Sequence, residues 1–277
     1  MIDRPLFLVL TVFSLAHADE RTRKLAERLP EEAAAFAREA TKYASEEKLT
    51  QHALENVRVV NGVAQLTWKD REVISRYGFV SFLEAPEALR ELRQIDRVDG
   101  KQPKGERSLK SIAAAVTAGD EARKRKLLED FEKAGFTGIA TNMGQLLLLF
   151  NARKVQSYDF SFRSQTFIGA ERIMIFTYAQ VEGGGMTTYR GKDTLKSKLS
   201  GEIWVNSEYR PVKITLNSNV EAPDKQIIRQ EMEVRYTPTP YPCVLPTLAR
   251  HRELRYGVVQ AETVYEYKPF RLWADLR

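Results

Sequence analysis

From Val155 onward the chain alternates between apolar and polar side chains, with turn-forming residues about every 12 positions. Between neighbouring turns there is almost no segment that could form a helix. Parallel strands need long crossover connections, so strands spaced this closely must pair antiparallel. The apolar residues of 210–220 fall on one side of their strand and the polar residues on the other, which is typical of a sheet with one buried and one solvated face. The predicted strands of this region are 155–163, 171–181, 195–206, 210–220, 226–237, 244–256 and 258–270.

The first hundred or so residues add further long strands. Residues 42–54 could continue a helix or form a strand, and we favour a strand. Asn61-Gly62 is a hairpin turn signal that leads into a long strand at 66–82. Asp99-Gly100 ends another strand, at 89–98. Together the two regions predict about ten antiparallel strands.

Helices are expected at the N-terminus and in the middle of the chain. Pro30 suits the first position of a helix, and acidic Glu31 and Glu32 suit its positive end. A helical insertion at about 104–150 separates the two strand regions, and its last segment, 142–150, ends in five consecutive large apolar residues. A helix without a polar face should be buried on all sides or packed into an apolar cavity. The prediction is therefore an α+β fold in which helices cover the concave face of a strongly curved antiparallel sheet.

Residues 1–18 have the features of a signal peptide. Arg4 precedes an apolar run, and Ala16-His17-Ala18 fits a small-x-small cleavage pattern. The apolar run has about 11 residues, whereas a membrane-spanning helix needs about 20. We expect cleavage after Ala18, a periplasmic or secreted protein, a single domain over 19–277 and no integral membrane segment after cleavage. Cys243 is the one cysteine, so no intrachain disulfide can form; its apolar neighbours predict a buried thiol.

Composition excludes several classes of protein. With 13 Phe, 11 Tyr and 3 Trp the chain has ample surface to bury, which excludes disorder throughout. The mean hydropathy of −0.40 excludes a multi-span membrane protein. The net charge of +6 could indicate nucleic-acid binding. However, charges alternate in sign along 229–235, which favours cross-strand ion pairs on a solvated face, so no nucleic-acid partner is expected.

No catalytic motif stands out. His52 and His251 lie in strand-like runs among charged neighbours, and we expect both to be exposed rather than metal ligands. The chain lacks a G-x-S-x-G nucleophile motif, and Gly191-Lys192-Asp193 fails the phosphate-loop pattern at two positions. We therefore expect no cofactor, no metal and no enzymatic activity.

Two sets of short motifs resemble known proteins. The strand Gly201–Asn206, the turn after it and Arg210–Ile214 are similar to a hairpin that recurs in the lipoprotein-localisation superfamily of exported bacterial proteins. Ser75–Phe79, Val98-Asp99-Gly100 and Leu245-Pro246 look like motifs of a group of uncharacterised exported proteins of that type. The resemblance implies an open half-barrel that holds an acyl chain or another apolar ligand without covalent chemistry.

This resemblance and the distribution of large apolar residues lead to the main hypothesis. We expect an exported soluble protein that binds a lipid, a lipoprotein acyl chain or a similar ligand in the half-barrel. The residues predicted to line the cavity are Trp68, Phe79, Leu147, Phe150, Phe160, Ile175, Trp204 and Ile214. The alternative is a structural or protein-interaction module of the envelope with a filled core and no ligand.

Overall fold

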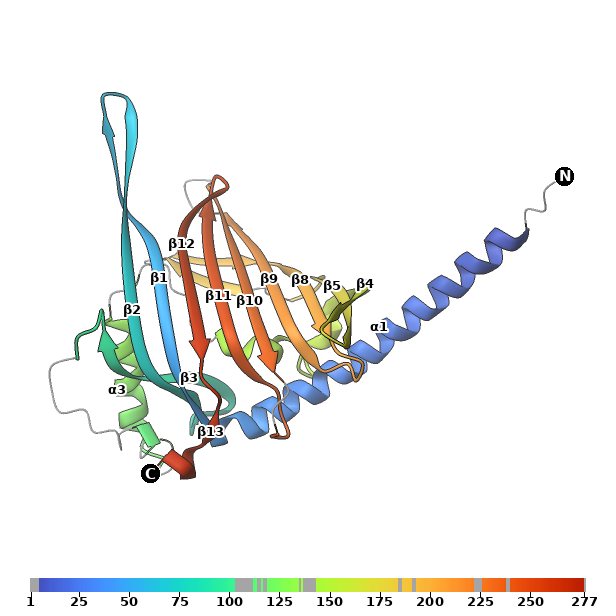
Figure 1. The fold of residues 1–277 in the computed structure, drawn as a ribbon, viewed down its shortest axis with the longest axis horizontal. Helices are drawn as coiled ribbons and strands as arrows, with labels where there is room; N and C mark the ends of the chain where they lie inside the picture. The colour runs from blue at the N-terminus through green and yellow to red at the C-terminus, as the bar shows by residue number, and fades with distance from the viewer. Residues whose placement is uncertain are drawn as a thin grey trace.

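The computed structural model describes residues 5–102, 112, 113, 116, 119–134, 136, 143–183, 186–190, 193–221, 226–237 and 240–276. Within these residues one long N-terminal helix runs beneath a curved open sheet, and a shorter helix stands at one end of that sheet (Figure 1). The predicted α+β class with a curved antiparallel sheet is confirmed.

The sheet contains eleven strands among the described residues, in the order β3-β2-β1-β12-β11-β10-β9-β8-β5-β4, with β13 paired to β1. All of its pairings are antiparallel. The strands are β1 (Tyr43–Val60), β2 (Val63–Phe82), β3 (Ala85–Val98), β4 (Tyr158–Ile168), β5 (Glu171–Gln180), β8 (Leu199–Val205), β9 (Pro211–Glu221), β10 (Ile227–Thr237), β11 (Leu245–Arg255), β12 (Val258–Tyr267) and β13 (Arg271–Leu272). A separate hairpin, β6 (Met186–Arg190) with β7 (Asp193–Ser197), was not predicted.

The turns that connect these strands contain residues with positive φ. Asn61 (φ 51°) and Gly62 (φ 77°) join β1 to β2, as their sequence predicted. Tyr256 (φ 51°) and Gly257 (φ 76°) join β11 to β12 in the same way. These tight connections keep sequence neighbours adjacent in the sheet.

Helix α1 (Pro5–Glu39) continues into a short 3-10 turn, η1 (Ala40–Lys42). The prediction that a helix starts at Pro30 is wrong, because Pro30 lies inside α1. A proline inside a helix costs a hydrogen bond. One side of α1 carries a fully buried apolar stripe, made of Leu25, Leu29, Ala33 and Phe36. The packing of this stripe offsets the lost hydrogen bond, so the helix continues past Pro30.

The face of the sheet that packs against α1 is called the inner face here. A second cover on that face is η2 (Met143–Phe150), which packs against α1, β9, β10 and β11. This segment is a 3-10 helix with a kink at Gln145. Leu148 and Leu149 are half-buried, so of the two predicted alternatives, burial on all sides is wrong. Another short 3-10 turn, η3 (Val155–Ser157), leads into β4.

The opposite, outer face is mainly solvated, except at β5, where Ile173 and Ile175 are buried, and where β3 ends the sheet. There α3 (Glu121–Glu132) packs on β3, and Asp120 caps its start by accepting a hydrogen bond from the Arg123 N–H (3.0 Å). A small cluster joins Leu92 and Val80 to Leu127 and to Trp273 of η4 (Trp273–Leu276), near the C-terminus. Both faces of β3 are thus buried.

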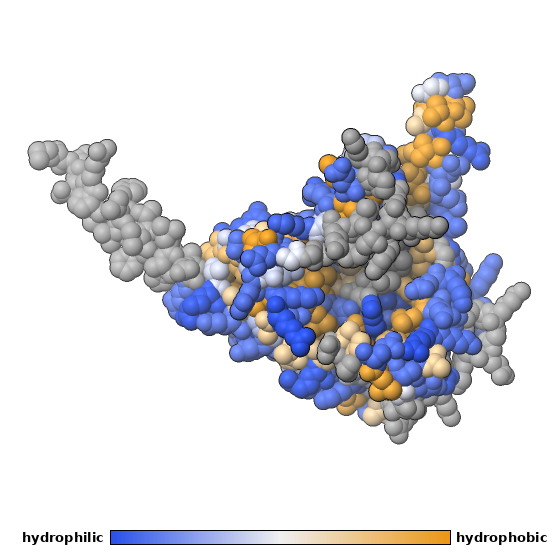
Figure 2. Space-filling model, turned by 180° about the vertical axis from the view of Figure 1, so that it is seen from behind, coloured by the Kyte–Doolittle hydropathy of each residue, from blue (hydrophilic) through white to orange (hydrophobic). Residues whose placement is uncertain are grey.

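The hairpin between β1 and β2 extends beyond the rest of the sheet (Figure 1). Val57 and Leu66 are direct partners on one side of the hairpin and are 50% and 48% exposed. Figure 2, seen from behind, shows apolar atoms at the projecting end. Within the described residues, no helix combines the length and the apolar character that a membrane crossing requires.

Candidate functional site

An apolar groove lies between α1 and η2. Its α1 wall is made of Pro30, Ala33, Ala34 and Ala37, whose small side chains let η2 approach. The groove has a volume of about 630 Å³ and is open to the surface. It is also lined by Ala88, Leu89, Gln145, Leu146, Leu148, Leu149, Asn151, Ala152, Arg153 and Lys154.

Five of the eight predicted cavity residues lie on the inner side. Phe79, Leu147, Phe150 and Ile214 are fully buried in the main core, and Phe160 packs against it. They fill the core rather than line the groove. The ring of Phe150, for example, is 5.0 Å from that of Tyr178 and 5.2 Å from that of Tyr158, centroid to centroid.

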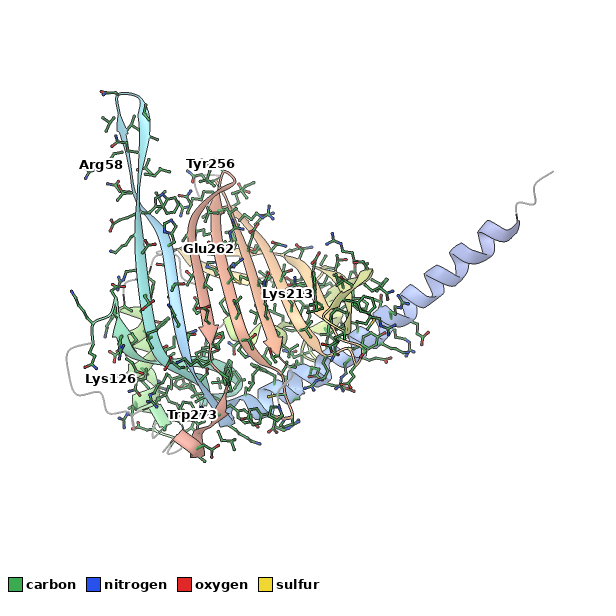
Figure 3. All side chains as sticks on the ribbon, in the orientation of Figure 1. Arg58, Lys126, Lys213, Tyr256, Glu262 and Trp273 are labelled. Atoms are coloured by element: carbon green, nitrogen blue, oxygen red, sulfur yellow. The ribbon has the colours of Figure 1, made fainter. Side chains whose placement is uncertain are left out.

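The other three predicted residues, Trp68, Ile175 and Trp204, lie on the outer face, so the prediction that all eight share one cavity is wrong. Ile175 and Trp204 are direct partners across β5 and β8, and the Lys213 amine lies 3.3 Å from the centroid of the Trp204 ring. Lys213 is labelled in Figure 3 on the solvated side of β9.

Trp68 stacks on the exposed ring of His52 with ring centroids 4.5 Å apart. Strand β2 alternates strictly, so the inward position of Tyr77 places Trp68 outward. Outer-face rings of this kind shield the sheet and take no part in the groove.

A second candidate site is a buried set of charges on the inner face, made of Glu47, Glu91 and Arg93 and called the charge cluster here. The Arg93 guanidinium donates to both oxygens of Glu47, at 2.7 and 2.8 Å, and to Glu91 at 2.8 Å. All three side chains are almost completely buried. The other oxygen of Glu91 accepts the backbone N–H of Gly144 at 2.5 Å, which ties the start of η2 to the sheet.

Aromatic rings enclose the charge cluster. The Arg93 guanidinium lies 5.0 Å from the centroid of Tyr77, 4.7 Å from Phe131 and 5.5 Å from Tyr265, in cation–π geometry. The hydroxyls of Tyr77 and Tyr267 are buried and have no hydrogen-bond partner among the described residues.

Burial sets the protonation behaviour of the charge cluster. It raises the pKa of Glu47, because the lowering effect of Arg93 is smaller than the cost of removing a carboxylate from water. Burial acts to lower the pKa of Arg93, but attraction to Glu47 and Glu91 outweighs it and raises that pKa well above its usual value. Arg93 therefore stays charged, and Glu47 is the group that can take up a proton.

The charge cluster was not predicted from the sequence. The available signal was the position of each residue in its strand. Glu47 lies on the same side of β1 as buried Leu49, and Glu91 and Arg93 lie on the same side of β3 as buried Leu89. A charged residue on the buried side of a strand needs an oppositely charged partner that forms hydrogen bonds with it. The partners, however, come from different strands, and strand pairing beyond hairpins could not be read from the chain.

His52 and His251 behave differently. His52 is exposed as predicted and hydrogen bonds to Asp70 (2.7 Å). His251 is buried, so the prediction that it is exposed is wrong. Its side chain points inward beside Met232 and Thr263, and neither ring nitrogen has a hydrogen-bond partner among the described residues. Burial lowers the pKa of His251 to about 4. The described residues contain no cluster of three or more side chains suited to a metal ion.

Two other predictions about side chains are confirmed. On the outer face Arg252 of β11 forms a cross-strand ion pair with Glu231 of β10, at 3.2 Å, whereas Arg229 pairs with Glu231 within β10, at 2.9 Å. Cys243 is buried, and burial raises the pKa of its thiol to about 12. Of the phosphate-loop-like sequence, Gly191 and Lys192 lie outside the described residues.

The chain was compared with known proteins in three ways. No protein-family model matches it. No curated protein matches it either. Among solved structures, a DUF1329 family protein from Desulfovibrio piger is similar at 12% identity, over 91% of this chain and 92% of that one, with a TM-score of 0.39. It is a distant structural neighbour.

Proposed function

We propose that the protein is an exported, non-catalytic binding protein for a ligand with an apolar chain, and that the chain lies in the groove between α1 and η2. The observation that carries this proposal is the groove itself, with alanines on one wall and Leu146, Leu148 and Leu149 on the other. Its volume of about 630 Å³ is within the range of about 300–1,000 Å³ that small-molecule sites occupy. Burying apolar surface contributes roughly 25 cal/mol per Å², so a chain needs no hydrogen bonds for useful affinity.

This site differs from the half-barrel interior that the sequence suggested. Aromatic side chains and η2 occupy the inner face, as the packing of Phe150 with Tyr158 and Tyr178 illustrates. Leu148 and Leu149 remain half-buried at the surface of η2, where a ligand could cover them. The proposal therefore places the ligand beside the core.

Export is part of the proposal. The N-terminal part of α1 projects away from the sheet (Figure 1), and Arg21, 4.7 Å from the ring centroid of Phe162, makes one of the first described contacts between the helix and the sheet. Removal of residues 1–18 leaves this packing intact. The intact mass of protein from the exported fraction should correspond to a chain that begins at Asp19. The mass of an uncleaved chain would contradict export.

Binding is tested with palmitate and monopalmitoylglycerol, by calorimetry on delipidated mature protein. The variant Ala34→Trp places a large ring in the groove at an exposed helix position and should abolish saturable binding of both ligands. The matched control is Glu27→Trp, which adds the same ring at an exposed position of α1 outside the groove. Wild-type protein that binds neither ligand would refute the proposed function.

The alternative, an envelope interaction module without a ligand, is favoured by the projecting hairpin. Val59 and Val63 are 71% and 65% exposed, which is unusual for apolar residues without a partner. Under this alternative, Val59→Ser with Val63→Ser abolishes capture of a specific envelope protein after crosslinking, and Ala34→Trp has no effect. Under the proposed function, Ala34→Trp abolishes ligand binding, and Val59→Ser with Val63→Ser has no effect.

A further inference from the structure

The groove has a charged end as well as apolar walls. The turn Asn151–Lys154, between η2 and η3, lines it together with Leu148 and Leu149. Arg153 and Lys154 in this turn are exposed, and neither side chain has an acidic partner among the described residues. Among the residues that the structure describes, two unpaired cations thus lie next to the apolar groove.

The turn is held in a defined conformation. The side-chain oxygen of Asn151 accepts the backbone N–H groups of Arg153 and Lys154, at 3.1 and 3.2 Å, and its amide donates to the carbonyl of Leu148 at 3.0 Å. The main-chain carbonyl of Asn151 accepts the same Lys154 N–H and also the N–H of Val155, at 2.9 Å each. These bonds fix the backbone that presents both cations.

The charges near the groove do not cancel those cations. Among the groove-lining residues that the structure describes, none is acidic. The nearest acids in sequence on α1 are already paired: Glu31 and Glu32 accept from Arg28 at 2.6 Å, and Glu39 accepts from Lys42 at 2.7 Å. An apolar slot with uncompensated positive charge at one end is complementary to an anionic amphiphile.

We infer that the ligand of the groove carries an anionic head group, a carboxylate or a phosphate, bound by Arg153 and Lys154 while its chain lies between α1 and η2. The inference rests on the proposed function and narrows it. A free fatty acid and an anionic phospholipid share this chemistry, and neutral acylglycerols lack it.

The test compares three probes by calorimetry below their micellar concentrations: palmitate, palmitoyl lysophosphatidylglycerol and neutral monopalmitoylglycerol. The double variant Arg153→Gln/Lys154→Gln should bind the anionic probes about three- to thirtyfold more weakly and the neutral probe unchanged, since exposed charge pairs contribute modestly. For the wild type, anionic binding should weaken from 0.05 to 0.5 M salt, because salt screens exposed charges.

The matched control is Arg58→Gln/Lys126→Gln, which removes the same charge from the projecting hairpin and from α3 (Figure 3) and should leave all three affinities unchanged. Equal affinity of wild type and double variant for the anionic probes overturns the head-group inference, even if the neutral probe still binds. Failure of all three probes overturns the proposed function instead. A preference for one anionic probe identifies the carboxylate or the phosphate as the natural head group.

Discussion

Replacing Arg93 with methionine would leave two carboxylates in the core without their cation. Arg93 makes three charge-assisted hydrogen bonds, two to Glu47 and one to Glu91. Methionine keeps much of the volume and the contacts with the surrounding rings. The change therefore isolates the electrostatic role of the side chain.

The size of the effect follows from burial. Removing one partner of a buried ion pair costs about 3–5 kcal/mol, because the remaining charge has lost its compensation. Glu47 and Arg93 are 0% and 2% exposed, so the upper part of this range applies. A domain has roughly 5–15 kcal/mol of total stability, so the variant should fold but be marginal at neutral pH.

The loss should depend on pH. Burial raises the pKa of Glu47 in the folded state, and removing Arg93 raises it further. A carboxyl group whose folded pKa exceeds its unfolded pKa stabilises the fold at low pH, and that contribution is lost as pH rises through the folded pKa. Each pH unit between the two pKa values changes stability by about 1.4 kcal/mol. The variant should therefore lie closer to the wild type at pH 5 than at pH 8.

The assay is urea unfolding followed by tryptophan fluorescence at pH 5, 6, 7 and 8. The control is the triple variant Glu47→Gln/Glu91→Gln/Arg93→Met, which removes all three charges and should recover most of the stability. A single variant that loses less than about 1 kcal/mol and shows the wild-type pH profile would refute the account of the charge cluster.

Three further predictions concern other sites. Gly144→Ala should lower stability by about 1–3 kcal/mol in thermal unfolding, because a Cβ there would lie 2.6 Å from the Tyr77 hydroxyl. An unchanged unfolding midpoint would contradict this close approach of Gly144 to Tyr77. The contribution of His251 to stability should be lost as pH falls from 6.5 toward 4, since the unfolded state binds a proton that folded His251 refuses. His251→Leu should remove this contribution and change the pH dependence of stability in urea titrations; equal slopes would argue against a buried neutral imidazole. Val59→Thr should change the free energy of unfolding by no more than about 0.5 kcal/mol, and a larger loss would mean that the hairpin packs against another part of the chain.

Much of the sheet could be predicted because its signals are local. The alternation of 210–220 and the turn at Asn61-Gly62 reappear as β9 and the β1–β2 hairpin. Local alternation does not identify the buried face where both sides of a strand are apolar. Strand β5 has Ile173 and Ile175 on one side and Met174 and Phe176 on the other, so Ile175 was assigned to the inner face wrongly.

The groove and the charge cluster depend on contacts between distant segments. The course of α1 through Pro30 is set by packing against residues far along the chain, as in the approach of Phe36 to Phe79 with ring centroids 5.1 Å apart. Glu91 and Gly144 are 53 positions apart and meet only after η2 covers the sheet. Such pairings follow from the order of strands, and no motif in the sequence encodes that order.

The projecting β1–β2 hairpin has a practical use in experiments. Its end at Asn61-Gly62 has open space around it, and a Cβ built at Gly62 meets no atom within 4 Å. An epitope, a fluorophore or a short protease site could therefore be inserted there with little strain on the core. A label at this point would report on the rotation and encounters of the whole molecule while leaving the groove, on the inner side, unmodified.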